Sequence, residues 1–142
     1  MVELPALASR DAVAVSASSL RNTFITQPQQ TNMHGRIFGG FLMRRGYELA
    51  FATTYAFAGV RPTFVKVDEV VFVKPVDVGD LLRLESKVMH TASGSLSESL
   101  LFVDVVASIA KPEQLDIANT NVFSFVFSVR RGDLPRVLPD GE

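Results

Sequence analysis

Residues 39–58 read GGFLMRRGYELAFATTYAFA, and this stretch decides the fold. Wound as a helix, it has apolar residues around most of its circumference, and its only charges are Arg44, Arg45 and Glu48. Gly59 follows directly, and glycine suits the left-handed position just after a helix end. The pattern therefore predicts one helix of about 18 residues, roughly 27 Å long, that is buried on most sides and carries Glu48 in its middle.

The rest of the chain has the alternating, β-branched pattern of strands. One strand is expected before the helix, and four are expected after it, joined by short connections. The expected strands are residues 20–27, 62–74, 81–91, 96–110 and 118–130, with a hairpin loop at 92–95.

This order of elements predicts an α+β domain in which an antiparallel sheet wraps around one long central helix. Short consecutive links favour antiparallel pairing, and one sheet must curl around one helix to bury both apolar faces. Such a sheet leaves its edge strands unpaired. Pairing with a second unit is therefore expected, through a sheet edge or through the helix side.

Length and composition fit a single domain. The chain has 142 residues, of which 47% are hydrophobic and 20% are charged, as in ordinary globular proteins. Residues 1–19 are predicted to form an N-terminal arm and residues 20–142 the folded domain. The arm lacks the basic start and unbroken apolar stretch of a secretory signal. No run approaches the roughly 20 apolar residues of a membrane-spanning helix, so a membrane span is not expected.

The charged residues and the cysteine count argue against several kinds of function. Fourteen Lys and Arg against fifteen Asp and Glu give a net charge of −1, so nucleic acid is not an expected partner. The absence of cysteine excludes disulfides, a thiolate nucleophile and a thiolate metal site, and it fits a reducing, intracellular compartment. His34 and His90 lie far apart in the sequence, and no metal or cofactor is expected.

The loop before the helix and the start of the helix carry a motif. Residues 32–43, NMHGRIFGGFLM, resemble the N-x-x-G-x-x-F-G-G-x-L-M signature of hotdog-fold acyl-CoA thioesterases. Residues 68–80 are similar to the next strand and turn of that family. Residues 120–125 resemble the second hotdog repeat of the acyl-CoA thioesterase 9-like branch. The resemblance spans roughly residues 20–140, nearly the whole chain.

The resemblance implies a hotdog fold and hydrolysis of a fatty acyl-CoA to free fatty acid and CoA. It also implies a site built across two hotdog units, one giving an Asn from the loop and the other an acid from the helix. Asn32 fits the first role and Glu48 the second, although many relatives carry Asp at the position of Tyr47. A mitochondrial or plastid location is compatible with the resemblance.

Thioester hydrolysis needs an activated water, a polarised carbonyl and a place for CoA. Glu48 can act as a general base or as a nucleophile that forms an anhydride, and the sequence leaves both open. Asn32 can orient the water or the carbonyl, while backbone N–H groups near Gly39 and Gly40 can stabilise the oxyanion. Glu48 lies about 12 Å along the helix from Gly40, so a two-fold related neighbour presents its acid to Asn32 more easily than the same chain does.

Each candidate residue also has a structural interpretation. Asn32 can cap a turn, although the surrounding motif favours a functional role, and Glu48 can pair with Arg44 or Arg45. His34 is expected to be a loop residue, and Tyr47 to belong to the core or an interface.

Three basic residues are candidates for contacts to the CoA phosphates, although single basic residues on strands usually face solvent. They are Arg61, Lys66 and Lys74.

Two other functions stay open. A dehydratase acting on a carrier-bound acyl chain would need a His and an acid near the helix, and the position of His34 in the loop disfavours it. The second is a non-catalytic hotdog half that binds acyl-CoA or supplies the interface of a double-hotdog enzyme. Because Asn32 and Glu48 occur in one chain, a competent homodimer or higher oligomer is favoured.

Overall fold

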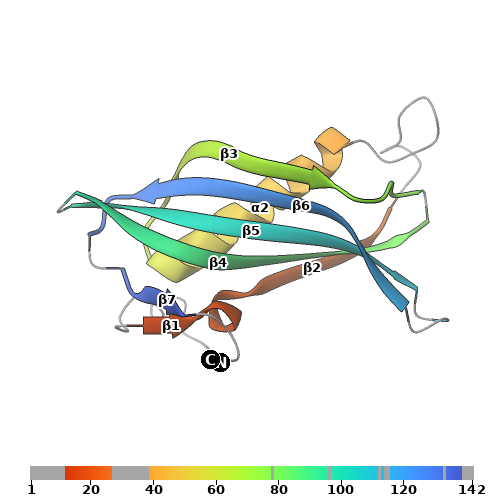
Figure 1. Ribbon diagram of the computed structural model, residues 1–142, viewed down its shortest axis with the longest axis horizontal. Coiled ribbons are helices and arrows are strands. Elements are labelled where there is room, and N and C mark those ends of the chain that lie inside the picture. Colours follow the sequence, from red (N-terminus) through yellow and green to blue (C-terminus); the bar gives the residue numbers. More distant parts are fainter. Residues whose placement is uncertain are drawn as a thin grey trace.

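The architecture is one long helix lying against an antiparallel sheet, as predicted (Figure 1). The computed structural model describes residues 12–26, 39–77, 79–95, 97–111, 113, 116–132 and 134–138. The helix is α2 (Gly39–Ala58), and the sheet has the strand order β2-β4-β5-β6-β3. The strands are β2 (Leu20–Ile25), β3 (Thr63–Phe72), β4 (Leu81–Ser95), β5 (Glu98–Lys111) and β6 (Asp116–Val129).

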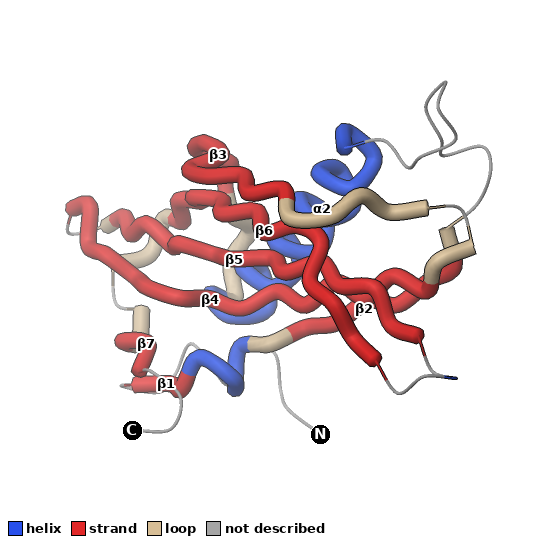
Figure 2. The backbone as a smooth tube through the Cα atoms, turned by 45° about the vertical axis from the view of Figure 1, so that its right-hand side comes forward, coloured by secondary structure: helices blue, strands red, loops and turns tan. Residues whose placement is uncertain are grey.

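Helix α2 has the predicted bounds and crosses one face of the sheet, against β4, β5 and β6 (Figure 2). Gly59 ends the helix with a φ of 76° and donates its N–H to the Tyr55 carbonyl at 2.9 Å. The positive φ explains why glycine stands there. The side chains between helix and sheet form the core, among them Leu42, Phe57, Leu84, Val103, Val105, Phe123, Phe125 and Phe127.

Gly46 is a point of close contact between α2 and the sheet. A Cβ atom there would lie 3.2 Å from Cδ2 of Phe123 and 3.7 Å from Cγ1 of Val105. A larger side chain would displace these core residues. This close contact sets the distance between the helix and the sheet. The neighbouring residue Tyr47 thereby packs against the aromatic side chains of β6.

Residues 92–95 continue strand β4, so the prediction of a loop there is wrong. A register shift lets the strands stay paired, with Ser93 opposite Ser99 and Ser95 opposite Glu98. The β4–β5 hairpin is therefore longer than its Gly and Ser content indicated.

Two short strands that the sequence did not reveal pair outside the main sheet. They are β1 (Ala12–Ala14) and β7 (Arg136–Leu138), which run parallel. The 3-10 helix η1 (Val15–Ser18) follows β1, and within it Ser18 Oγ donates a hydrogen bond to the Val15 carbonyl at 2.7 Å. The same Oγ accepts a hydrogen bond from the Val88 N–H at 2.9 Å, which attaches η1 to β4. Within the described residues, no helix has the length and hydropathy needed to cross a membrane.

Candidate active site

Glu48 lies on the outer side of α2. Its side chain is 57% exposed, and its carboxylate oxygens lie 3.9 Å from Nε of Arg44 and 4.0 Å from Nε of Arg45. The expectation of a carboxylate within a largely buried helix is therefore wrong for the single chain, because one sheet covers only one side of one helix. The carboxylate is available to solvent or to a neighbouring unit.

Tyr47, by contrast, packs inward, as expected for a core or interface residue. Its ring centroid lies 5.4 Å from that of Phe64 and 5.9 Å from that of Phe127. It is half-buried and contacts the core cluster. Adjacent helix residues thus face different surroundings, since one step turns a helix by about 100°.

Strand β3 forms a sheet edge that is largely exposed. Among the described strands β3 pairs with β6 alone, and nine of its ten residues are exposed. The exposed apolar side chains on it and directly after it are Phe64, Val65, Val67, Val71, Phe72 and Val73. An exposed edge with this composition favours pairing with another chain.

The three basic residues that are candidates for contacts to the CoA phosphates lie far apart, on β3 or next to its ends. Arg61 precedes the strand and stacks on Tyr55, with 5.4 Å from its Cζ atom to the ring centroid. Nζ of Lys66 lies 3.6 Å from Oδ1 of Asp68, with which it forms an ion pair. Lys74 follows the strand, and its backbone N–H donates to the Thr120 carbonyl at 3.2 Å. A ten-residue strand spans roughly 33 Å, so Arg61 and Lys74 of one chain do not share one phosphate group.

The loop residues Asn32 and His34 lie outside the described residues. Gly39 and Gly40 open helix α2, where the first backbone N–H groups have no partner within the helix. A Cβ atom built on Gly40 would meet no atom of the described residues within 4 Å.

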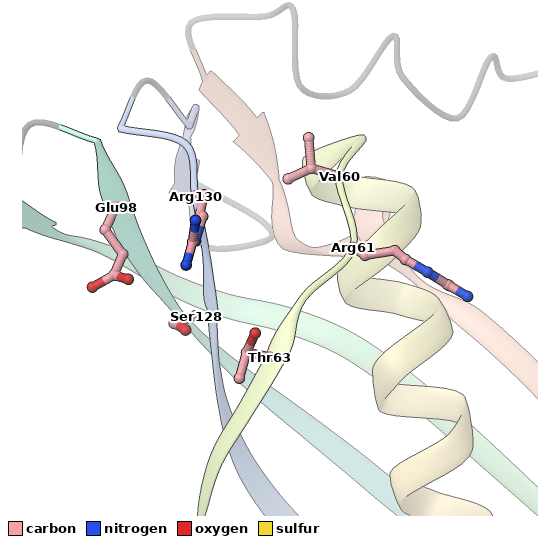
Figure 3. Close-up of a pocket in the computed structure, with 6 residues that line it drawn as sticks. All are labelled: Val60, Arg61, Thr63, Glu98, Ser128 and Arg130. Carbon is pink, nitrogen blue, oxygen red and sulfur yellow. The ribbon is translucent and has the colours of Figure 1, made fainter.

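A polar pocket of about 390 Å³, which sequence reasoning missed, lies at one end of the sheet (Figure 3). Thr63 and Ser128 are cross-strand partners on β3 and β6, and both line it. The other lining residues are Val60, Arg61, Glu98 and Arg130. Strand pairing brings Thr63, Glu98 and Ser128 together, and of the lining residues the sequence indicated only Arg61.

Asn121 is a second polar residue that the sequence did not indicate as a site residue. It is 1% exposed, and its Oδ1 atom accepts no hydrogen bond from any residue that the structure describes. It directly follows Thr120, the extra residue of a β-bulge between Ala107–Ser108 and Asn119–Asn121. Bulges often re-aim side chains near functional sites.

Glu85 joins β2 to β4 on the outer sheet surface. It accepts hydrogen bonds from Ser19 Oγ at 2.9 Å and from Arg21 Nε at 3.1 Å. Burial raises the pKa of Glu85, but these two hydrogen bonds and the charges of Lys87 and Arg21 outweigh it and lower the pKa overall. Among the described residues, no group of three or more His, Asp or Glu side chains is placed to hold a metal ion.

Comparison with known proteins shows which proteins the chain resembles, although no protein-family profile matches it. Acyl-coenzyme A thioesterase 4, mitochondrial, and acyl-coenzyme A thioesterase 2, chloroplastic, both from Humulus lupulus, are 51% and 48% identical over 98% and 90% of this chain. The chain covers 26% and 29% of their lengths, about a quarter. The fold matches an acyl-CoA hydrolase from Staphylococcus aureus in complex with butyryl coenzyme A and coenzyme A. The TM-score is 0.82 at 25% identity, covering 92% of this chain and 80% of that one. Over nearly its whole length the chain is thus similar in sequence to acyl-CoA thioesterases, and it shares the hotdog fold of a solved acyl-CoA hydrolase.

Proposed function

We propose that this chain hydrolyses fatty acyl-CoA to free fatty acid and CoA, at a site shared between two hotdog units. The observation that carries the proposal is the sequence match over nearly the whole chain to proteins named acyl-CoA thioesterases. No cofactor takes part in the proposed reaction. Water and a carboxylate suffice, since a thioester already has a good leaving group.

In the proposed reaction, Asn32 and the N–H groups near Gly39 and Gly40 bind the thioester carbonyl, and Glu48 of a second unit supplies the acid. As a general base, Glu48 takes a proton from water while the water oxygen bonds to the carbonyl carbon. The C–S bond then breaks, and CoA leaves as a thiol after it regains the proton. As a nucleophile, Glu48 would instead form an anhydride that water cleaves. The exposed position of Glu48 supports its presentation to a neighbouring unit.

The second unit is proposed to pair along the β3 edge, in the antiparallel direction. This pairing would cover the exposed apolar side chains of β3, such as Val67 and Val71. It would also bring the start of one β3 strand beside the end of the other. Arg61 of one unit and Lys74 of the other would then lie on the same side of the assembly, which one chain alone does not achieve.

A second candidate is a hotdog half that works only with an unlike unit. The chain corresponds to about a quarter of the length of its curated relatives. The helix position at which many relatives carry Asp holds Tyr47, whose ring packs against Phe64 and Phe127. In this alternative, Asn32 of this chain meets an acid from a different hotdog unit, and the chain alone binds acyl-CoA without turnover.

For the compartment, we propose a mitochondrion or a plastid. The two curated relatives are named mitochondrial and chloroplastic. Imaging of a fluorescent fusion of the full-length protein beside organelle markers tests this assignment.

The proposed activity predicts release of CoA thiol from a series of acyl-CoA substrates of increasing chain length. A thiol reagent follows the reaction, and the protein adds no background because it has no cysteine. Turnover with at least one chain length is the expected result. A folded chain that binds CoA but turns over no substrate would exclude the competent homo-oligomer and leave the half-unit function.

A further inference from the structure

Thr26, the residue that directly follows strand β2, is held by the turn that connects β3 to β4. It is 1% exposed. Its N–H donates to the Asp80 carbonyl at 3.1 Å, and its carbonyl accepts from the Gly79 N–H at 3.2 Å. Its hydroxyl donates to the Asp77 carbonyl at 2.8 Å and lies 3.2 Å from the Asp80 carbonyl oxygen. The backbone N–H, the backbone carbonyl and the side-chain hydroxyl of Thr26 are therefore all bound to this one turn.

The turn is itself held in a defined shape. The Asp80 N–H donates to the Asp77 carbonyl at 3.2 Å, and Oδ2 of Asp80 accepts from the Asp77 N–H at 2.8 Å. Gly79 has a φ of 90°, which glycine adopts without strain. Val76, directly before Asp77, is 2% exposed and belongs to the core cluster. The turn therefore gives Thr26 a fixed partner.

Strand β2 is also fixed to the start of helix α2. The rings of Phe24 and Phe41 are in edge contact, with their centroids 6.0 Å apart. Cζ of Arg45 lies 4.0 Å from the centroid of the Phe24 ring. The end of β2, the β3–β4 connection and the first turn of α2 lie at the same end of the sheet (Figure 1). Thr26 and Gly39, the residues on either side of the segment 27–38, thus belong to one packed base.

We propose that Thr26 is a positioning residue for Asn32, because it fixes the point from which the segment that carries Asn32 starts. Asn32 lies six residues after Thr26 and seven before Gly39. In so short a segment, a shift of one anchored end is passed on to the residues between the two ends. The inference rests on the proposed function, in which Asn32 binds the thioester carbonyl. Since a misplacement of about 1 Å can lower a rate strongly, loss of the anchor should lower turnover.

Thr26→Val tests the proposal, because valine has nearly the shape of threonine but cannot donate to the Asp77 carbonyl. We expect kcat for acyl-CoA hydrolysis to fall about tenfold. KM should change much less, because the contact made by Asn32 strengthens in the transition state. Thr26→Ser keeps the hydroxyl and should retain most of the wild-type kcat. Thiol release over a range of acyl-CoA concentrations measures both constants.

Thr91→Val is the matched control. Thr91 lies ten residues along β4 from Leu81, and its hydroxyl donates to the Pro135 carbonyl at 3.0 Å. Each valine variant loses one hydrogen bond between distant parts of the chain, so Tm should fall by a similar few degrees in both. Only Thr26→Val should lower kcat. An equal fall of kcat in both variants would indicate a general loss of stability and overturn the proposal.

The double variant Thr26→Val with Asn32→Ala shows whether Thr26 acts through Asn32. If it does, replacing Thr26 should lower kcat no further once Asn32 is alanine. A further fall of about tenfold would give Thr26 a role independent of Asn32 and overturn the proposal. A kcat of Thr26→Val within about twofold of the wild type would overturn it as well.

The proposed function and the positioning role can fail separately. In ¹H–¹⁵N spectra, the backbone signal of Asn32 should shift in Thr26→Val and stay in place in Thr91→Val, whether or not the chain hydrolyses acyl-CoA. This shift in a chain without turnover would reject the catalytic function of the lone chain and support the positioning role. Turnover together with an unchanged Asn32 signal would support the function and reject the positioning role. An unchanged signal without turnover would reject both.

Discussion

Replacing Asn32 with alanine is expected to lower kcat for acyl-CoA hydrolysis about 100-fold or more, the usual effect of removing a group that stabilises the developing oxyanion. KM should change much less, because the contact strengthens as the transition state forms. Thiol release at saturating acyl-CoA measures the effect. A kcat within about twofold of the wild type would reduce Asn32 to a turn residue.

Glu48→Gln distinguishes the two roles of the helix carboxylate. A catalytic acid predicts a fall in kcat of about 100-fold or more, whereas a surface ion pair predicts a loss of only about 0.3–0.5 kcal/mol in the free energy of unfolding. Arg44→Gln is the matched control, because it removes the partner at 3.9 Å and keeps the carboxylate. Loss of activity in Glu48→Gln alone supports catalysis, while equal activity in both variants would contradict it.

Introducing a charge on the β3 edge is expected to separate the paired units. Val67 is exposed on this edge in the single chain, and Val67→Lys would place a charge in the proposed interface. The dissociation constant of the pair should rise roughly 100-fold, since desolvated or like charges cost several kcal/mol. Analytical ultracentrifugation measures the dissociation, and kcat per chain should fall with it.

The control for this variant is Met89→Lys. Met89 is also a large exposed apolar residue, but it lies on β4, away from the β3 edge. Its replacement should change neither the assembly nor the turnover. Pairing that survives Val67→Lys and fails in Met89→Lys would move the interface to the outer face of the sheet.

The helix and the sheet order could be predicted because each depends on local pattern. A 20-residue apolar segment ending at a glycine defines α2, and strands separated by short turns define the antiparallel order. The length of the β4–β5 hairpin was harder to predict from the sequence. Gly and Ser at residues 93–95 are typical of a loop, yet the cross-strand pairing continues to Ser95. Strands β1 and β7 are three residues each, and their pairing joins opposite ends of the chain.

The exposure of the site residues could not be predicted from helix periodicity. The helix has apolar residues on most sides, yet the single chain covers only one side, so Glu48 and Tyr55 remain exposed. The same mismatch is what the proposed pairing predicts, since a neighbouring unit would then cover part of α2. The polar pocket depends on the register between β3 and β6, which no local sequence feature fixes.

The most direct test of the shared site mixes two inactive chains. Asn32→Ala and Glu48→Gln carry their defects in different parts of the same composite site, so a mixed pair has one site with both groups intact. Co-expression with two different tags isolates the mixed pairs. In an unselected equal mixture, half of the two-fold symmetric pairs are mixed and each has one intact site of two, so roughly a quarter of wild-type activity should return. Activity no greater than the sum of the two variants measured separately would contradict a site shared between two copies of this chain.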